Sequence, residues 1–361
     1  MANEHALLAG GGSGGHVFPA LAVADELRQR GWQVSWMGRM SGMERELVEA
    51  RGLPYQGLSA KAVVGRRPFQ KVAALGTLAA SSWRARQMVR DSEADVVLGT
   101  GGYVSVPGVL GAALSKRPVV LLEPNAEAGS ANRWLSRWAS SAAVALPGTE
   151  GQLRCPSRVT GVPVRREFFT ALDTRPTSGA LRLLVLGGSQ GARQLNQLVP
   201  AALEQLGDRL AGLEVVHQVG EALQEEAEST YRKSNSRGHQ VRVVPFLDDV
   251  AAEMAAADLV ISRAGAITVA EICAAGRAAL LVPLALAGGH QVANAQRLAA
   301  SGGAAVLTPE TADAASLVTL LESLLDDRQR LRSMGETLRG LAWPQAAESV
   351  ADLLREAVEA A

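Results

Sequence analysis

The sequence is poor in the features that mark several classes of protein. It has only two cysteines, Cys155 and Cys273, with no CxxC spacing, so neither a disulfide framework nor a thiolate metal site is expected. Aromatic residues are 4% of the chain, and 36 Lys and Arg balance 36 Asp and Glu. No basic surplus is available for nucleic acid, so we expect no nucleic-acid partner.

Long uncharged apolar runs are also missing. No segment approaches the roughly 20 apolar residues of a membrane-spanning helix, and the first residues show no signal peptide. Because both features are missing, we expect a cytosolic protein, and peripheral membrane contact is left open. The length of 361 residues suits two domains.

What the chain does have is a glycine-rich turn, Gly10–Gly15, between an apolar run at 6–9 and a helical segment that starts at His16. Glycines permit positive φ and close approach of a ligand. The helix N-terminus would point free N–H groups at the turn, which suits a phosphate. A second such turn, Gly187–Gly191, follows the apolar run 181–186. The repetition predicts two halves of similar build.

Apolar runs alternate with helical segments along both halves. This predicts an α/β fold, with a doubly wound parallel sheet in each half. Residues 173–179 have linker composition, and Pro344 separates a final amphipathic helix that can pack elsewhere. Pro107 is expected in the first turn of its helix, where proline is tolerated. The expected strands lie at 6–9, 32–37, 95–98, 118–122, 181–186, 214–218, 240–244, 259–261, 279–282 and 304–307.

Ligands of such sheets bind beyond the carboxyl ends of the strands. Seven loops follow expected strands and therefore belong at those edges. They are Gly10–Gly15, Gly99–Tyr103, Glu123–Asn125, Gly187–Gly191, Phe246–Leu247, Ser262–Gly265 and Pro283–Gly289.

Two of the five histidines lie next to these loops, at His16 and His290. A histidine titrates near neutral pH and can take a proton from a hydroxyl, so His16 is a candidate general base. A half-buried capping histidine is the structural alternative.

The stretch from Ser262 to Glu271 combines a strand end, a glycine turn and a helix start. The free N–H groups of Ala266, Ile267 and Thr268 could hold a diphosphate. The Glu271 carboxylate, which has no evident partner in the sequence, could accept two ribose hydroxyls. An ordinary acid favoured by the helix dipole is the alternative.

No Asp-x-Asp and no metal-spaced cluster of His, Asp and Glu occurs in the chain. A diphosphate would therefore be neutralised by helix ends and arginines, with Arg165 and Arg263 as candidates, and no metal site is predicted.

The turns also fit three other sequence patterns in part. Gly10-x-Gly12-x-x-Gly15 formally fits a dinucleotide fingerprint, but the second strand ends in Met37-Gly38-Arg39 without the acid that ribose binding needs. Ser13 and Ser189 lie in GxSxG patterns, and Asp258 and His290 follow Ser189 in the order of a hydrolase triad. No Gly-Lys-Ser/Thr follows either turn, which excludes a Walker-type NTPase.

The segment 61–90 mixes basic and apolar residues. It could be a solvated helix face or could press on an anionic membrane, with apolar side chains inserted and basic ones on lipid phosphates. The candidate membrane contacts are Leu75, Leu78, Trp83, Lys71, Arg84 and Arg86.

Through these residues the chain resembles the UDP-N-acetylglucosamine-dependent transferases of glycosyltransferase family 28. The resemblance runs nearly end to end through four motifs. They are Gly11–Ala22 (GGSGGHVFPALA), Gly101–Ser105 (GGYVS), Gly187–Arg193 (GGSQGAR) and Arg263–Glu271 (RAGAITVAE).

The resemblance implies two Rossmann-like domains facing across a cleft, the GT-B arrangement. It assigns residues 1–164 plus 344–361 to a lipid-acceptor and membrane-associating domain, and 165–343 to a UDP-sugar donor domain. It implies transfer of N-acetylglucosamine from UDP-N-acetylglucosamine to the muramoyl C4 hydroxyl of lipid I, giving lipid II and UDP. No cofactor is required, and stimulation by a divalent cation is left open. Implied partners are both substrates, the anionic inner leaflet and other cell-wall synthesis proteins. The implied location is the cytoplasmic face of the bacterial plasma membrane.

Family positions carry over residue by residue. His16 is the first candidate base and Glu123 the second, and Tyr103 would lie near the acceptor with His16. Ser13, Gly14 and Gly15 would lie at the diphosphate or reacting sugar. The implied donor contacts are Asn125, Arg165, Ser189, Leu247 (facing uracil), Arg263, Ala266, Ile267, Thr268, Glu271 and Gln291.

The chain departs from the family pattern at Leu122 and Pro124, at Val162, and at Gly288-Gly289-His290 before Gln291. The last departure bears on sugar recognition, because it removes one of two glutamine amides. Two rivals to this function are a related GT-B transferase with another acceptor and a sugar-nucleotide-binding subunit without activity.

Overall fold

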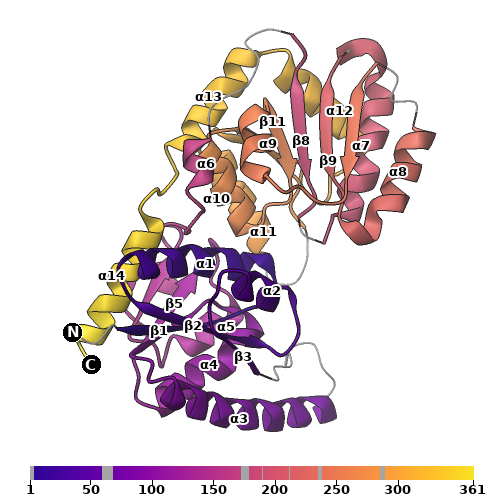
Figure 1. The fold of residues 1–361 in the computed structure, drawn as a ribbon. Helices are drawn as coiled ribbons and strands as arrows, with labels where there is room; N and C mark the ends of the chain where they lie inside the picture. Colours follow the sequence, from indigo (N-terminus) through magenta and orange to yellow (C-terminus); the bar gives the residue numbers. More distant parts are fainter. Residues whose placement is uncertain are drawn as a thin grey trace. The chain divides into compact units, whose positions relative to one another are not determined.

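In the computed structural model the chain forms two compact units (Figure 1). Unit 1 comprises Met1–Val164 and Trp343–Ala361, and unit 2 comprises Arg165–Ala342. The structure does not describe the side chains of residues 43 and 68–75. The described residues are 4–58, 68–171, 179–188, 190–210, 212–234, 238–284 and 289–361.

Unit 1 contains a seven-stranded sheet in the order β3-β2-β1-β4-β5-β6-β7, and every neighbouring pair is parallel. The order reverses between β1 and β4, which creates a topological switch point at their carboxyl ends. The strands are β1 (His5–Ala9), β2 (Gln33–Arg39), β3 (Tyr55–Leu58), β4 (Val96–Gly99), β5 (Val119–Glu123), β6 (Ser141–Val144) and β7 (Ser157–Val159).

Helices cover both faces of this sheet (Figure 1). Side chains alternate along each strand, so Ala6 and Leu8 pack into a core with α1 and α14, while Leu7 and Ala9 pack toward α3, α4 and α5. The helices are α1 (Gly14–Gln29), α2 (Met43–Glu49), α3 (Pro68–Asp91), α4 (Gly102–Leu114), α5 (Ser130–Leu135), η1 (Glu150–Gln152) and α14 (Ala346–Glu359).

The last helix, α14, returns to unit 1. Its buried face packs on α1 and on the central strands β4, β5 and β6. Two ion pairs hold its exposed side: Arg30 to Asp352 at 2.7 Å, and Arg158 to Glu356 through two bonds at 2.9 and 3.0 Å. Apolar burial on one face of the helix thus docks it.

Unit 2 contains a six-stranded sheet in the order β10-β9-β8-β11-β12-β13, again parallel throughout. Its switch point lies between β8 and β11. The strands are β8 (Arg182–Leu186), β9 (Glu214–Gln218), β10 (Gln240–Val244), β11 (Leu259–Ser262), β12 (Ala278–Leu281) and β13 (Ala304–Val306).

One core of unit 2 joins alternate strand residues, such as Leu183 and Val185, to α7 and α12. The helix α9 packs against the strand β8 and the helix α10. The helices are α6 (Glu167–Thr170), α7 (Arg193–Leu206), η2 (Gly207–Leu210), η3 (Glu221–Leu223), α8 (Gln224–Lys233), α9 (Val250–Ala256), α10 (Ala266–Ala275), α11 (His290–Ala300), α12 (Ala314–Leu325) and α13 (Arg328–Arg339).

The predicted pair of doubly wound parallel sheets is confirmed. The prediction for Pro107 is wrong, because α4 begins at Gly102 and Pro107 lies in its second turn. Gly101 and Gly102 both have positive φ, at 84° and 69°, which lets the helix start at once after β4. Pro107 has no N–H, so the Tyr103 carbonyl lacks the usual helical donor.

Candidate active site

In each unit the motif loops lie beyond the carboxyl ends of the strands. In unit 1 the turn Gly10–Gly15 follows β1 and the turn at 100–101 follows β4, on either side of the switch point. In unit 2 residues 187–188 follow β8 and the turn at 263–265 follows β11, at the corresponding places. Parallel register therefore gathers the predicted loops of each unit at one edge of its sheet.

His16 lies in the first turn of α1 and is fixed by the turn after β4. Its Nδ1 lies 2.8 Å from the Thr100 carbonyl oxygen. A carbonyl can only accept, so the neutral ring carries its proton on Nδ1 and a lone pair on Nε2. A Cβ on Gly102 would lie 3.0 Å from that Nε2. The ring therefore needs glycine at this point of the turn.

The rest of the first turn lies at the same edge. Ser13 is the exposed N-cap of α1, and its carbonyl accepts from the His16 N–H at 3.1 Å. Gly14 and Gly15 are half-buried at the helix start. Tyr103, at the start of α4, is 37% exposed. The structure thus brings Ser13, His16 and Tyr103 together.

Glu123, the second candidate base, is 1% exposed and accepts four hydrogen bonds. The donors are the Asn125 N–H and side-chain amide at 3.1 and 2.9 Å, the Gly129 N–H at 2.8 Å and the Asn132 amide at 2.9 Å. Both oxygens are occupied in bracing the loop after β5. This geometry favours a structural role over proton transfer.

A buried carboxylate that the sequence did not single out supports the first turn. Glu44 of α2 is 0% exposed, and its Oε1 accepts from the Arg39 backbone N–H at 3.3 Å and from Arg39 Nε at 3.2 Å. A Cβ on Gly11 would lie 2.5 Å from Oε1. One glycine of the turn is therefore required by Glu44.

In unit 2 the turn before α10 presents helix N–H groups at the sheet edge. Gly265 is the N-cap of α10, so Ala266, Ile267 and Thr268 carry the first backbone donors of the helix. Arg263 is tied into the fold, because its Nη1 donates to Gln194 at 2.8 Å and to the Val282 carbonyl at 3.0 Å. Burial lowers the pKa of Arg263.

Glu271 was predicted to lack a partner, and that prediction is wrong. Arg165 lies 3.9 Å from its Oε1 and also pairs with Glu167 at 2.9 Å. The Glu271 side chain is 14% exposed. Burial raises the pKa of Glu271 to about 7, against the opposing effect of Arg165. The carboxyl group therefore changes charge near neutral pH.

Two strand-end loops of unit 2 are joined by Gln218, the last residue of β9, which the sequence did not single out. Its side-chain amide donates to the Gly188 carbonyl at 2.9 Å and to the Pro245 carbonyl at 3.5 Å. It thus links the turn after β8 to the loop after β10. In that loop Leu247 is 5% exposed, whereas the neighbouring Phe246 is 61% exposed.

The remaining donor candidates are Gln291 and Ser189. Gln291, in the first turn of α11, accepts from the Leu284 N–H at 3.0 Å. Ser189 lies outside the described residues, as does Gly288. The structure is incompatible with the hydrolase triad, because Asp258 precedes β11 at the amino edge and bonds to the Arg182 N–H at 2.9 Å. His290 follows β12 at the opposite edge.

The candidate membrane residues that are described lie on α3. Trp83 is 57% exposed, and the Arg86 guanidinium stacks 4.8 Å from the centre of its ring. Arg86 also donates to the carbonyl of Leu114, which is 54% exposed. Arg84 is exposed and Leu78 half-buried, while the side chains of Lys71 and Leu75 lie outside the described residues.

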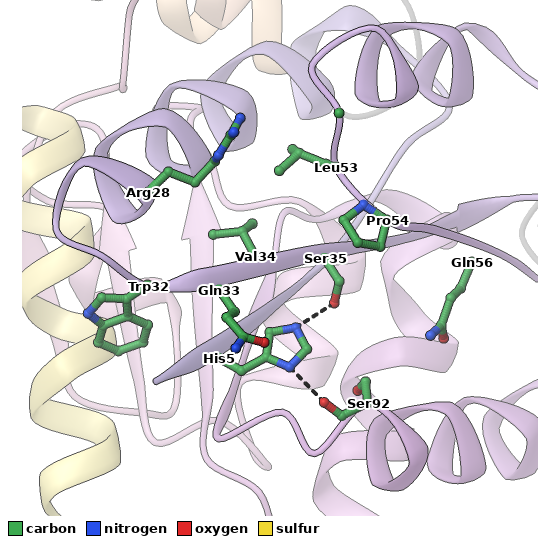
Figure 2. Close-up of a pocket in the computed structure, with 11 residues that line it drawn as sticks. His5, Arg28, Trp32, Gln33, Val34, Ser35, Leu53, Pro54, Gln56 and Ser92 are labelled. Carbon is green, nitrogen blue, oxygen red and sulfur yellow. Dashed lines mark hydrogen bonds between the residues drawn. The ribbon is translucent and has the colours of Figure 1, made fainter. Parts of the chain in front are cut away.

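A cavity of about 450 Å³ lies at the other edge of the unit 1 sheet (Figure 2). His5 on its wall is fixed by the Ser92 carbonyl at 2.7 Å and the Ser35 hydroxyl at 2.8 Å. Trp32 and Arg28 complete much of the wall. None of the predicted site residues lines it, so chemistry is better assigned to the carboxyl edges.

Within the described ranges no group of three or more His, Cys, Asp or Glu side chains could hold a metal ion. A search of the same ranges finds no helix long and apolar enough to cross a membrane.

Models of the two domains of one family match the chain in sequence order. The glycosyltransferase family 28 N-terminal domain matches residues 6–144, and the family 28 C-terminal domain matches residues 182–353. Together they cover most of both sheets.

Relatives match over nearly the whole length. Proteins from Stutzerimonas stutzeri (strain A1501) and Ectopseudomonas mendocina (strain ymp) are 44% and 43% identical over 97% of this chain and 98% of their own. Both are named UDP-N-acetylglucosamine–N-acetylmuramyl-(pentapeptide) pyrophosphoryl-undecaprenol N-acetylglucosamine transferase. The crystal structure of Acinetobacter baumannii MurG is 35% identical, with a TM-score of 0.82 over 98% of this chain and 99% of that one.

Proposed function

This chain belongs to glycosyltransferase family 28, and we propose that it transfers N-acetylglucosamine from UDP-N-acetylglucosamine to lipid I. The acceptor atom is the C4 hydroxyl of the muramoyl sugar of undecaprenyl-diphosphate-linked MurNAc-pentapeptide. The products are lipid II and UDP, in peptidoglycan synthesis. The observation that carries this function is the full-length match to relatives of that name, together with the GT-B fold.

We assign the acceptor to unit 1 and the donor mainly to unit 2. Support in unit 1 comes from His16 and Tyr103 at one switch point. In unit 2 it comes from the start of α10 and from Glu271, which suit a diphosphate and a ribose. The other proposed donor contacts are Ser13, Gly14, Gly15, Asn125, Arg165, Ser189, Leu247, Arg263 and Gln291.

His16 is the proposed base. The Thr100 carbonyl holds the ring so that Nε2 can take the proton of the C4 hydroxyl. As the oxygen bonds to the donor's anomeric carbon, the bond from that carbon to the UDP oxygen breaks, with inversion. The electron pair leaves on UDP, and the N–H groups at the start of α10 stabilise that charge. Glu123 is proposed to brace the loop that carries Asn125.

Membrane association is proposed through α3 and the end of α4. Trp83 and Leu114 would insert while Arg86, which contacts both, meets lipid phosphates. This would hold the enzyme at the cytoplasmic face of the plasma membrane, where other cell-wall synthesis proteins are candidate partners. Trp83→Ala should weaken sedimentation with phosphatidylglycerol vesicles, whereas Leu341→Ala, an exposed leucine elsewhere, should not.

The decisive experiment is UDP release from UDP-N-acetylglucosamine with a short-chain lipid I analogue, with and without EDTA. UDP-N-acetylgalactosamine is the control donor. Acceptor-dependent release with the first donor alone is expected. Donor binding without release would favour another acceptor or a binding subunit.

Replacement of the base tests the mechanism separately. His16→Ala should lower kcat by about 10²–10⁴-fold if it carries general-base catalysis. The matched control is His239→Ala, because His239 precedes β10 at the amino edge. A near-normal rate for His16→Ala would remove His16 from this role.

A further inference from the structure

Arg39 occupies a position at the unit 1 edge that neither the motifs nor the mechanism uses. It is the last residue of β2, and β2 pairs with β1 so that Met37 lies opposite Ala9. Arg39 therefore lies beside the Gly10–Gly15 turn. Its side chain is 34% exposed.

Two contacts hold the guanidinium in place. Nε donates to the buried Glu44 at 3.2 Å, and Nη1 reaches the Tyr103 hydroxyl at 3.5 Å. The Tyr55 hydroxyl donates to the Arg39 carbonyl at 2.5 Å, which fixes the backbone as well. Arg39 thus spans from the turn after β1 to the start of α4.

Gly102 and Tyr103 connect Arg39 in space to the proposed base, His16. Gly102 lies against Nε2 of His16, and the next residue, Tyr103, contacts Arg39. In the proposed acceptor, C4 of the muramoyl sugar and C1, which carries the diphosphate, lie at opposite ends of one hexose ring. A sugar whose C4 hydroxyl meets His16 would therefore direct its diphosphate one ring away along this edge.

We propose that Arg39, positioned by Glu44 and Tyr103, binds the diphosphate of the lipid-linked acceptor. The inference rests on the proposed function, since it assigns the anionic group of that substrate. The planar guanidinium donates paired N–H groups with the spacing of phosphate oxygens. Glu44 engages Nε and the backbone N–H, and the Tyr103 hydroxyl takes one N–H of Nη1. The second N–H of Nη1 and both of Nη2 are the donors proposed for the ligand.

A purely structural ion pair is the competing explanation. Glu44 is 0% exposed and needs a cation, and Arg39 supplies one. A structural pair alone would change stability and all substrates alike. A diphosphate ligand would change only the KM for acceptors that carry the diphosphate.

The test is steady-state kinetics of Arg39→Gln with two acceptors, one with the diphosphate and one with an uncharged spacer in its place. Arg45→Gln is the matched control, because Arg45 on α2 is exposed and pairs with Glu49 at 2.8 Å. Arg39→Gln should raise the KM for the diphosphate acceptor about 10- to 100-fold, as expected for charge-assisted hydrogen bonds. Its KM for the donor and for the uncharged acceptor should equal that of the unsubstituted enzyme.

A variant with an unpaired Glu44 could fail to fold. The double variant Glu44→Gln/Arg39→Gln leaves no unpaired buried charge, and it should show the same selective loss. Equal losses on both acceptors, or an unchanged KM for the diphosphate acceptor, would overturn the inference. If the unsubstituted enzyme releases no UDP with either acceptor, the proposed function fails instead.

Discussion

Lowering the pH from 8 to 6 should weaken binding of UDP-N-acetylglucosamine through Glu271. Burial raises the pKa of this carboxyl to about 7. About ten-elevenths of it is then ionised at pH 8 and about one-eleventh at pH 6. If only the carboxylate accepts the ribose hydroxyls, the Kd should rise about tenfold over this range, or about 1.4 kcal/mol.

The assay is calorimetric titration with the donor alone between pH 5.5 and 8.5. The diphosphate diester of the donor does not titrate there, and a His16→Ala background removes the proposed base as a second titrating group. Glu271→Gln should bind more weakly at pH 8 and lose the pH dependence. A wild-type Kd that is flat from pH 6 to 8, or an unchanged slope in Glu271→Gln, would refute the assignment.

The same pKa predicts a cost in stability. The folded protein holds the Glu271 proton more tightly than the unfolded chain, because the pKa is raised from 4.5 to about 7. Its contribution to stability is therefore lost as pH rises through this window, up to about 3 kcal/mol. Glu271→Gln should raise the free energy of unfolding by urea at pH 8 but not at pH 4.5.

Three further predictions concern other parts of the two units. Burial lowers the pKa of His217 to about 3, so the free energy of unfolding should fall by up to about 1.4 kcal/mol per pH unit below pH 6.5. Urea unfolding of His217→Phe should show a smaller dependence of this free energy on pH. An unaltered dependence would contradict the prediction. Gly161 has φ 74°, and a Cβ there would lie 2.2 Å from Trp343, so Gly161→Ala should cost about 2–4 kcal/mol. The control Gly151→Ala, where no atom lies within 4 Å of the added Cβ, should keep a melting temperature near that of the wild type in calorimetry. Equal drops in melting temperature for the two variants would exclude the clash. Gln218→Leu should raise the donor KM about 3- to 10-fold, because two loops lose their shared hydrogen-bond donor, and an unchanged donor KM would disprove that link.

Most strands and the carboxyl edge of each sheet were predictable because their signals are local. The strands β3, β6 and β7 have no counterpart among the expected ones. Apolar runs between helical segments indicated parallel sheets, and parallel strands place their following loops at one edge. His16 and the start of α10 could be found in this way. The start of α4 was misplaced, because the extra turn before Pro107 depends on the positive φ of Gly101 and Gly102.

The partners of the charged groups could not be predicted. Arg165 and Glu271 are far apart in the sequence and meet only because α10 packs against the segment at α6. Glu123 reads as a loop acid in the sequence, yet four donors enclose it. Hydrophobic periodicity does not record such enclosure, because the donors come from other positions of the folded chain.

The sequence by itself thus determined the two parallel sheets, their glycine turns and the family, because these follow from local pattern and from motifs that run the length of the chain. Tertiary structure alone decided which ring nitrogen of His16 carries the proton, why position 11 requires glycine, and which groups hold the Arg39 side chain. The physical reason is that hydrogen bonding, burial and close backbone approach arise between segments distant in sequence, and only folding brings those segments within contact.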